Sequence, residues 1–318
     1  IKLNNSVLNM RLIFMGSPKF ALPVLKSLIG SQHDLVGIYT QPDKPSGRGK
    51  KMHSPAVKLF AKDIGFDVHQ PSSLKDLKIS HEISRLKPDV IIVAAYGKLI
   101  PKELLSIPKF GFWNLHPSLL PEYRGPSPVI SAILDGKTST GVTLMQINEG
   151  LDTGPIIDQE QFKFNITDSA EEVTEKLFTI GSEMLIKNLP DLISGNVMPQ
   201  PQTENLATIT KLVKKSDGLI NWNDTAEYII RMERAYRNWP GIYTKWKNKT
   251  IKILEARTNK SDQIYESPGK VEKFEDNLIV QTAKGGVIIS KLKLEGKKEV
   301  ASLDFISGYP DFINSKLS

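Results

Sequence analysis

The stretch DVIIVAA at Asp89–Ala95 decides the fold class of this chain. It is rich in β-branched residues and almost free of polar ones, which indicates a strand buried on both faces. Strand-like runs alternate with helical patterns on both sides of it, so we predict an α/β fold with a Rossmann-like, doubly wound and mostly parallel sheet. The expected strands are 11–16, 34–39, 89–95, 111–116 and 141–147, and the expected helices are 20–29, 55–64, 129–134 and 170–189.

The pattern changes after the polar stretch 195–210, GNVMPQPQTENLATIT, which is typical of a linker. Short strands separated by Gly and Asn follow one more helix at 225–235, and they indicate a small barrel or sandwich. We therefore expect a first domain at 10–194, a linker at 195–210 and a smaller C-terminal domain at 211–318. The expected strands of the last domain are 242–246, 250–256, 269–273, 277–281 and 287–294.

Charge is distributed unevenly along the 318 residues, which carry a net charge of +7. The part up to Glu204 has 22 basic and 21 acidic residues, whereas the part from Asn205 has 20 and 14. Nearly all of the excess therefore lies in the last third. This asymmetry favours a polyanionic partner such as nucleic acid, and a solvated Lys-rich surface is the alternative.

Composition excludes several classes of protein. The chain has no Cys, which excludes disulfides, Cys-ligated zinc, iron–sulfur clusters and a Cys nucleophile. No apolar run approaches the roughly 18 residues of a membrane span, and no secretory signal is recognised, so we expect a cytoplasmic protein of the bacterial cytosol or an organelle matrix. The first nine residues are set aside, a monomer is expected, and no metal site is predicted because four histidines lack ligand spacing: His33, His53, His69 and His81.

Gly16-Ser17-Pro18 follows the first predicted strand, where a dinucleotide-binding fold carries G-x-G-x-x-G. Gly16 has no glycine two or five positions later, so a pyrophosphate cannot approach the backbone closely. No G-x-x-x-x-G-K-[ST] loop is present either. We therefore expect that the predicted sheet does not bind NAD or FAD in the dinucleotide-binding mode and that its ligand is a different molecule.

The segment 112–125, FWNLHPSLLPEYRG, carries the strongest chemical signal. Side chains alternate along a strand, so Asn114 and His116 are expected on the same side, near the carboxyl end where open α/β sheets bind ligands. A carboxamide and an imidazole side by side can donate two hydrogen bonds to one developing oxyanion. The alternative is that both residues cap the loop.

A second segment, 142–154 with the sequence VTLMQINEGLDTG, predicts a strand and a Gly-rich turn that presents Asp152. A carboxylate beside an imidazole orients the ring. Asn114, His116 and Asp152 would then form an acyl-transfer site without a covalent nucleophile. Capping of its own turn is the alternative role for Asp152.

These two motifs, from Asn114 to Gly125 and from Gly150 to Gly154, resemble motifs of the 10-formyltetrahydrofolate-dependent formyltransferases. The resemblance to this family extends over the full chain. The resemblance implies that 10-formyltetrahydrofolate donates a formyl group. It implies a catalytic triad of Asn114, His116 and Asp152. It also implies a folate site lined by Ser118, Leu119, Leu120 and Pro121.

The basic stretch QPDKPSGRGKK at 41–51 is similar to an insertion in those family members that formylate the amino group of initiator methionyl-tRNA. Their second domain is OB-like, which agrees with the predicted C-terminal barrel. The resemblance implies that this loop contacts the acceptor stem of the tRNA through Arg48, Lys50 and Lys51. A solvated loop without a partner is the alternative.

Cations of the C-terminal part are the remaining candidates for tRNA contact. Lys211, Lys214 and Lys215 are expected to bind, and a wider basic surface would add Arg231, Arg234, Arg237, Lys245 and Lys247. Formylation of initiator methionyl-tRNA for translation initiation is the function that the resemblance implies. The alternatives are the same chemistry on a small amine, such as an amino-sugar nucleotide or a purine precursor, and a non-catalytic RNA-binding protein.

Overall fold

A computed structural model describes residues 9–46, 51–259 and 267–318 of the chain. The chain divides into two compact units. Unit 1 comprises the chain up to Pro128 together with Ser139–Lys163 and Thr174–Thr210. Unit 2 comprises Val129–Thr138, Phe164–Val173 and Lys211–Ser318. Two short segments from the first two-thirds of the sequence therefore belong to the C-terminal unit.

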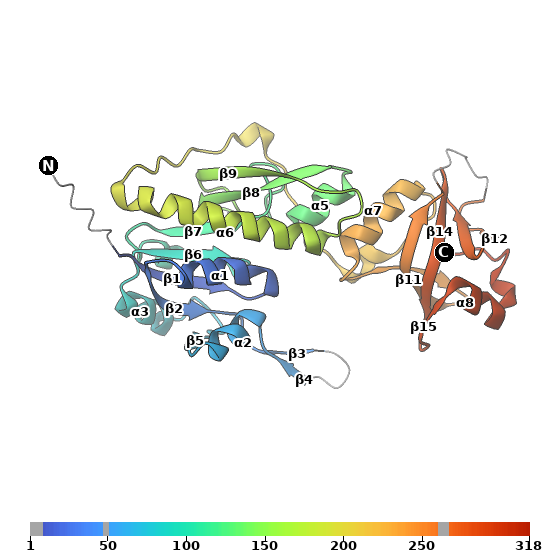
Figure 1. The fold of residues 1–318 in the computed structure, drawn as a ribbon, viewed down its shortest axis with the longest axis horizontal. Helices are drawn as coiled ribbons and strands as arrows, with labels where there is room; N and C mark the ends of the chain where they lie inside the picture. The colour runs from blue at the N-terminus through green and yellow to red at the C-terminus, as the bar shows by residue number, and fades with distance from the viewer. Residues whose placement is uncertain (1–8, 47–50, 260–266) are drawn as a thin grey trace. The chain divides into compact units, whose positions relative to one another are not determined.

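Unit 1 is built on one sheet, which has seven strands in the described part of the chain (Figure 1). Its first five strands are mutually parallel, and the last two each run antiparallel to their neighbour. This order confirms the doubly wound, mostly parallel sheet. Across the sheet the strands are β5 (Val68–His69), β2 (Asp34–Tyr39), β1 (Arg11–Gly16), β6 (Val90–Ala94), β7 (Phe112–His116), β8 (Ser139–Gln146) and β9 (Ile156–Lys163).

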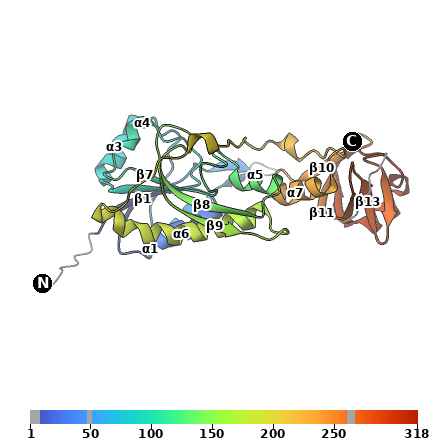
Figure 2. The same ribbon diagram turned by 90° about the horizontal axis from the view of Figure 1, so that it is seen from above.

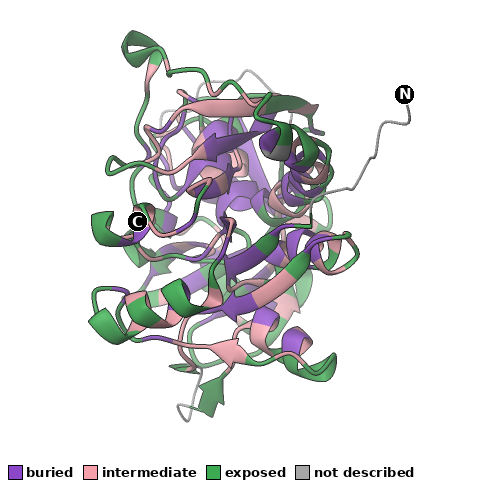
Figure 3. Ribbon diagram, turned by 90° about the vertical axis from the view of Figure 1, so that its left-hand side faces the viewer, coloured by how far each residue is buried: buried purple, intermediate pink, exposed green. Residues whose placement is uncertain are grey.

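Helices cover both faces of this sheet, as the burial of its central strands requires. Figure 2 shows α1 (Leu22–Ile29) and α6 (Ala170–Ser194) along one side, and α3 (Leu77–Leu86) and α4 (Lys102–Leu105) along the other. Alternate residues of β1 and β6, together with Phe112 of β7, join one core cluster with side chains of α3 and α4. All residues of β6 are buried, and buried segments run through the middle of the sheet in Figure 3. The helix α2 (Ala56–Asp63) also belongs to this unit.

Most predicted elements of unit 1 are found within one to five residues of their expected ends. The sequence did not predict β5, α3 or β9, nor α4, which has only four residues. β5 has only two residues, α3 buries only Ile83, and β9 is an edge strand whose side chains are mostly exposed or half-buried. Each of these elements lacks the continuous apolar run by which buried strands were recognised.

The start of α6 follows a capping box. Ser169 N and Oγ donate to the Glu172 carboxylate, and Glu172 N donates back to Ser169 Oγ at 3.3 Å. α6 contains 25 residues.

Among the described residues, no helix combines the length and the apolar character of a membrane span.

At the two ends of the basic stretch 41–51, β3 (Lys44–Ser46) pairs antiparallel with β4 (Lys51–His53), so that Lys44 lies opposite His53 and Ser46 opposite Lys51. We call this strand pair the β3–β4 hairpin. Lys51 is exposed. Arg48 and Lys50 lie outside the described residues.

Unit 2 contains an antiparallel sheet with six strands in the described ranges, which agrees with the expected OB-like class. Its core includes Trp246, which makes edge-on contacts with three aromatic rings of the last helical segments. Trp222 is also buried and donates to Thr244 Oγ1 at 3.0 Å, whereas Trp239 is 55% exposed. The elements are α5 (Pro128–Leu134), α7 (Ala226–Tyr236), β10 (Ile242–Trp246), β11 (Lys249–Thr258), β12 (Val271–Phe274), β13 (Asn277–Gln281), β14 (Gly286–Leu294), β15 (Glu299–Ala301) and α8 (Ser302–Gly308).

Candidate active site

Asn114 lies in the middle of β7, beside the end of β6. It pairs with Val93 on one side and with Met145 on the other, and β6 ends one residue after Val93. The Asn114 side chain is half-buried, and its carboxamide forms no hydrogen bond within the described part of the chain. The amide is therefore able to donate to a molecule bound at the carboxyl ends of β6 and β7.

His116 is the last residue of β7 and is buried, with 4% of its surface exposed. Its Nε2 lies 2.9 Å from the carbonyl oxygen of Tyr123. Because a carbonyl only accepts, Nε2 carries the hydrogen in this arrangement. Nδ1 lies 3.6 Å from Asp152 Oδ2. The ring is thus held from one side by a backbone carbonyl, and Nδ1 is the nitrogen that faces the carboxylate.

Asp152 adopts a left-handed backbone conformation with φ of 52°. Its Oδ2 accepts from Gly125 N at 2.8 Å, in the loop after β7. Asn148 caps the turn instead, because its Oδ1 accepts from Gly150 N and Thr153 Oγ1. The Asp152 carboxylate therefore faces His116 and Gly125 rather than its own turn, and its Oδ1 has no hydrogen-bond partner among the described residues.

The four residues expected to line a folate site differ in exposure. Ser118 and Leu120 are buried, whereas Leu119 and Pro121 are half-buried. The Ser118 hydroxyl donates to the Glu122 carbonyl at 2.7 Å. Ser118 O and Leu120 N both bond to the hydroxyl of Thr143 on β8. Ser118 and Leu120 therefore fix the loop, and Leu119 and Pro121 are the two of these residues that are partly exposed at its surface.

Arg124 and Gln202 are two residues that the sequence did not single out. The Arg124 side chain is 5% exposed and donates to Gln202 Oε1 and to both carboxylate oxygens of Glu204. Arg124 is 78 positions from Gln202 and 80 from Glu204, so no local sequence pattern connects them. The one available signal is an Arg inside the motif that ends at Gly125.

Two family models match this chain. The model described as formyl transferase matches residues 10–189, which is more than half of the chain, and the model for the formyl transferase C-terminal domain matches residues 212–310. The chain belongs to the formyltransferase family.

Curated relatives match this formyltransferase over most of its length. It is 41% identical to a methionyl-tRNA formyltransferase of Thermodesulfovibrio yellowstonii over 93% of this chain and 95% of the relative. It is 44% identical to a methionyl-tRNA formyltransferase of Chloroflexus aurantiacus over 80% of this chain and 82% of the relative. A solved N-formyltransferase of Helicobacter canadensis, in complex with folinic acid and dTDP-3-aminofucose, has a TM-score of 0.65. It is 20% identical and covers 89% of this chain and 99% of its own, so the likeness shows a shared fold.

Gln41 joins three strand ends of this formyltransferase beside β7. Its amide donates to the carbonyls of Tyr96 and Gly97, and its backbone N–H donates to Ser17 Oγ. Tyr96 is buried, which raises its pKa to about 12, and its hydroxyl has no partner among the described residues. The segments that follow β1, β2 and β6 are thereby tied together, and of these three strands β6 is the one that pairs with Asn114.

The base of the β3–β4 hairpin is anchored by Asp43. Lys58 of α2 donates to both carboxylate oxygens, at 2.8 and 2.7 Å, and Gln70 donates to one of them at 2.9 Å. These hydrogen bonds, with that from Lys58 the largest cause, lower the pKa of Asp43 to about 2. Asp43 thus connects the start of the hairpin to α2 and to the residue after β5.

The C-terminal cations fall into two groups. Lys211, Lys214 and Lys215 are exposed. The arginines of α7 are engaged: Arg231 donates to the Leu134 carbonyl at 2.9 Å, and Arg234, which is 5% exposed, donates to the carbonyls of Asp168 and Asn165. The expectation of a basic surface that includes Arg234 is therefore wrong, because its guanidinium is buried in hydrogen bonds.

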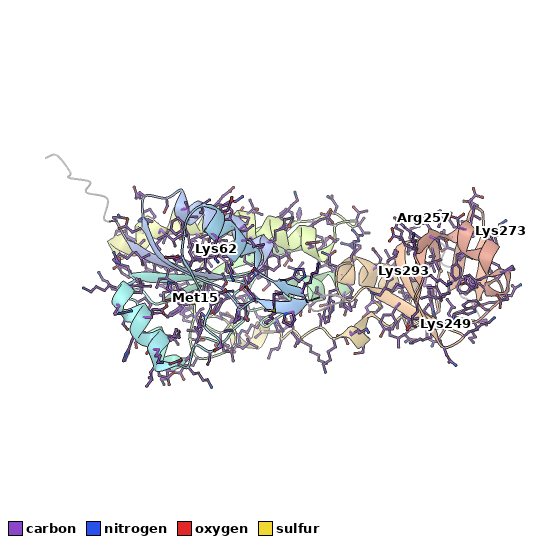
Figure 4. The ribbon with its side chains drawn as sticks, turned by 90° about the horizontal axis from the view of Figure 1, so that it is seen from below. Met15, Lys62, Lys249, Arg257, Lys273 and Lys293 are labelled. Atoms are coloured by element: carbon purple, nitrogen blue, oxygen red, sulfur yellow. The ribbon has the colours of Figure 1, made fainter. Side chains whose placement is uncertain are left out.

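Further cations of this formyltransferase lie on strands that the sequence reasoning did not name as binding. Figure 4 labels side chains from β11, β12 and β14 of unit 2, all of them exposed. On two adjacent strands, Lys252 stands directly opposite Lys293. Like charges placed opposite each other are unfavourable, so a polyanion on this sheet would relieve the repulsion. The labelled side chains are Lys249, Arg257, Lys273 and Lys293.

Proposed function

We propose that this formyltransferase transfers the formyl group of 10-formyltetrahydrofolate to the amino group of initiator methionyl-tRNA, for translation initiation. The observation that carries the choice of acceptor is the likeness to methionyl-tRNA formyltransferases over 93% of this chain and 95% of the relative. The chemistry is supported by a free carboxamide at Asn114 beside the His116–Asp152 pair. No covalent nucleophile is required, because an amine attacks a formyl carbonyl directly.

In the proposed reaction the amine nitrogen bonds to the formyl carbon, and the bond from that carbon to N10 of the folate breaks. Asn114 donates to the oxyanion of the tetrahedral intermediate. Since Nε2 of His116 carries the hydrogen that the Tyr123 carbonyl accepts, Nδ1 is the nitrogen that takes up a proton, and it acts as a second donor only after it has done so. Oδ1 of Asp152, directly or through a water, accepts the proton that the amine loses, and the departing N10 receives it back.

The donor is proposed to bind along the loop at Ser118–Pro121. Leu119 and Pro121 offer half-buried apolar surface to a pteridine ring. Ser118 and Leu120 act indirectly, by holding the loop through Thr143. The folinic acid in the Helicobacter canadensis enzyme supports a folate-type donor for a protein of this fold.

For the tRNA we propose contacts from three cations of the basic stretch 41–51, Arg48, Lys50 and Lys51, and from the exposed lysines Lys211, Lys214 and Lys215. Phosphate contacts make binding depend steeply on salt. The proposed division of labour follows the sequence boundaries, with catalysis in 10–194, a joining segment at 195–210 and tRNA binding in 211–318. A cytoplasmic monomer that needs no metal completes the proposal.

A single assay separates this function from its alternatives. The enzyme is incubated with 10-formyltetrahydrofolate and either methionyl-initiator tRNA or an amino-sugar nucleotide, and the formylated product is measured. We expect product with the tRNA alone. Product with the sugar amine would favour the acceptor seen in the Helicobacter canadensis complex, and RNA binding without product from either acceptor would indicate a non-catalytic protein.

A further inference from the structure

The segment 199–210, which we call the strap, is hydrogen-bonded to the loop after β7 and to the start of β9. Gln200 exchanges two backbone hydrogen bonds with Ile156, at 2.7 and 2.8 Å. The Thr208 carbonyl accepts from Arg124 N, its backbone N–H donates to the Pro121 carbonyl, and its hydroxyl accepts from Tyr123 N at 2.7 Å. A segment with the composition of a linker therefore supports the candidate active site much as a neighbouring strand would.

Gln202 of the strap uses all of its hydrogen-bonding capacity. Its Nε2 donates to the carbonyls of Asp152 and Gly154, at 2.8 and 2.7 Å. Its Oε1 accepts from Arg124 Nε at 3.0 Å and from Nη2 at 2.8 Å. One side chain thus connects the turn that carries Asp152 to the loop that carries Gly125.

Arg124 keeps this amide in place. Its guanidinium is buried, and Glu204 accepts from Nη1 and Nη2, at 3.0 and 2.8 Å. Those hydrogen bonds lower the pKa of Glu204, so the carboxylate stays ionised and opposes the buried positive charge. The backbone N–H of the next residue, Gly125, donates to Asp152 Oδ2.

Asp152 is consequently held at two points, its carbonyl by Gln202 and its carboxylate by Gly125. Thr210 lies close against Gly125, because a Cβ atom added to Gly125 would lie 2.9 Å from Thr210 Oγ1. These contacts fix how far the carboxylate stands from His116 Nδ1.

We propose that Gln202, oriented by Arg124, is a positioning residue that sets the Asp152 carboxylate against His116. This inference rests on the proposed function for its catalytic consequence. A displacement of about 1 Å in a catalytic group costs up to roughly 100-fold in rate, so the strap influences kcat without touching either substrate.

The test compares Gln202→Met with Gln200→Met. Both variants remove an amide from the strap, but within the described ranges the side chain of Gln200 donates only to the Met198 carbonyl, two residues away. In formylation of methionyl-tRNA we expect Gln202→Met to lower kcat about 10- to 100-fold with KM for both substrates within about threefold. Gln200→Met is expected to stay within about twofold of wild type. Equal rates for the two variants, or a loss confined to KM, would overturn the proposal.

A double-mutant cycle separates positioning from general loosening. If Gln202 acts through Asp152, then Gln202→Met should change the residual rate of Asp152→Asn by less than about twofold. Independent, multiplicative losses would contradict it. Gln202→Glu keeps an oxygen for Arg124 but turns a second oxygen toward the two carbonyls, so its kcat should fall even if Gln202→Met folds poorly.

Hydrogen exchange distinguishes a failure of this inference from a failure of the proposed function. In Gln202→Met, and not in Gln200→Met, the amide of Gly125 should exchange faster, because its acceptor on Asp152 has moved. Faster exchange of Gly125 together with an inactive wild-type enzyme would refute the proposed function but support the positioning role of Gln202. Unchanged protection of the Gly125 amide in Gln202→Met would refute the positioning role of Gln202, whatever the activity of the enzyme.

Discussion

The loop at Ser118–Gly125 and the hairpin at Lys44–His53 are held in different ways. The loop is hydrogen-bonded to β8, to the strap and to the Asp152 turn. The described part of the hairpin is anchored at its base, where Asp43 meets Lys58 and Gln70. The contrast teaches that the loop beside His116 and Asp152 is fixed on several sides, whereas the described part of the hairpin, which carries Lys51, is anchored at its base. Changes in the loop should therefore alter kcat, and changes in the hairpin should alter tRNA binding.

Removing the free carboxamide should produce the largest effect. Asn114→Ala is expected to lower kcat by about 10²–10³-fold, because the oxyanion then lacks one preorganised donor. Single-turnover formylation at saturating donor measures the step. Asn196→Ala, at an exposed position outside the site, is the matched control. Near-wild-type turnover by folded Asn114→Ala would end the assignment of Asn114.

Gly125→Ala tests whether the loop depends on close approach of the strap. Gly125 has φ of 103°, and a Cβ would meet Thr210 Oγ1 at 2.9 Å. We expect a decrease of about 1–3 kcal/mol in the free energy of unfolding and a fall of kcat, since the donor to Asp152 moves. Urea unfolding and kcat are measured together. Gly65→Ala, where φ is also positive but nothing lies within 4 Å, separates backbone strain from the contact.

Lys51→Ala addresses the other side of the comparison. If Lys51 neutralises one phosphate of the tRNA, the slope of log affinity against log salt should become shallower by about 0.7–0.9 in the variant. Donor KM and kcat should not change. Lys62→Ala, which removes an exposed cation of α2, serves as the control. A parallel decrease of donor affinity in Lys51→Ala would show that the hairpin is not a tRNA element.

Asp43→Asn is expected to have the smallest effect, and that effect depends on pH. The folded-state pKa of Asp43, about 2, lies below its ordinary value of 3.8. The ion pair therefore stabilises the fold above about pH 4, and the stabilisation is lost as the pH falls from 4 toward 2. Unfolding of wild type and Asp43→Asn should differ at pH 7 and converge toward pH 3. A difference that persists unchanged at pH 3 would indicate that the Asp43 charge is not responsible.

The sequence predicted those features that depend on local pattern. The run at Asp89–Ala95 predicted β6 because burial on both faces requires continuous apolar residues. The alternation along β7 placed Asn114 and His116 on one side. The roles of these residues and of Asp152 stay predictions, but their proximity could be anticipated from two motifs at strand ends.

Other features were inaccessible because they depend on contacts between distant residues. Nothing near Gln202 indicates that its partners are Arg124, Asp152 and Gly154, at least 48 positions away. Net charge likewise did not distinguish exposed lysines from arginines that satisfy carbonyls. Arg234 contributes to the basic composition of the last third, yet its charge is buried, which lowers its pKa.

The arginines of α7 have a consequence for how this chain can be divided. Arg231 and Arg234 donate to carbonyls of Leu134, Asn165 and Asp168, which precede the sequence boundary at 195–210 but belong to unit 2. A truncation after residue 210 would remove the donors and leave these acceptors behind, and an exchange of residues 211–318 with a homologue would pair foreign arginines with native carbonyls. The two units are interleaved along the chain, so recombination that respects the fold must exchange Val129–Thr138 and Phe164–Val173 along with the C-terminal part.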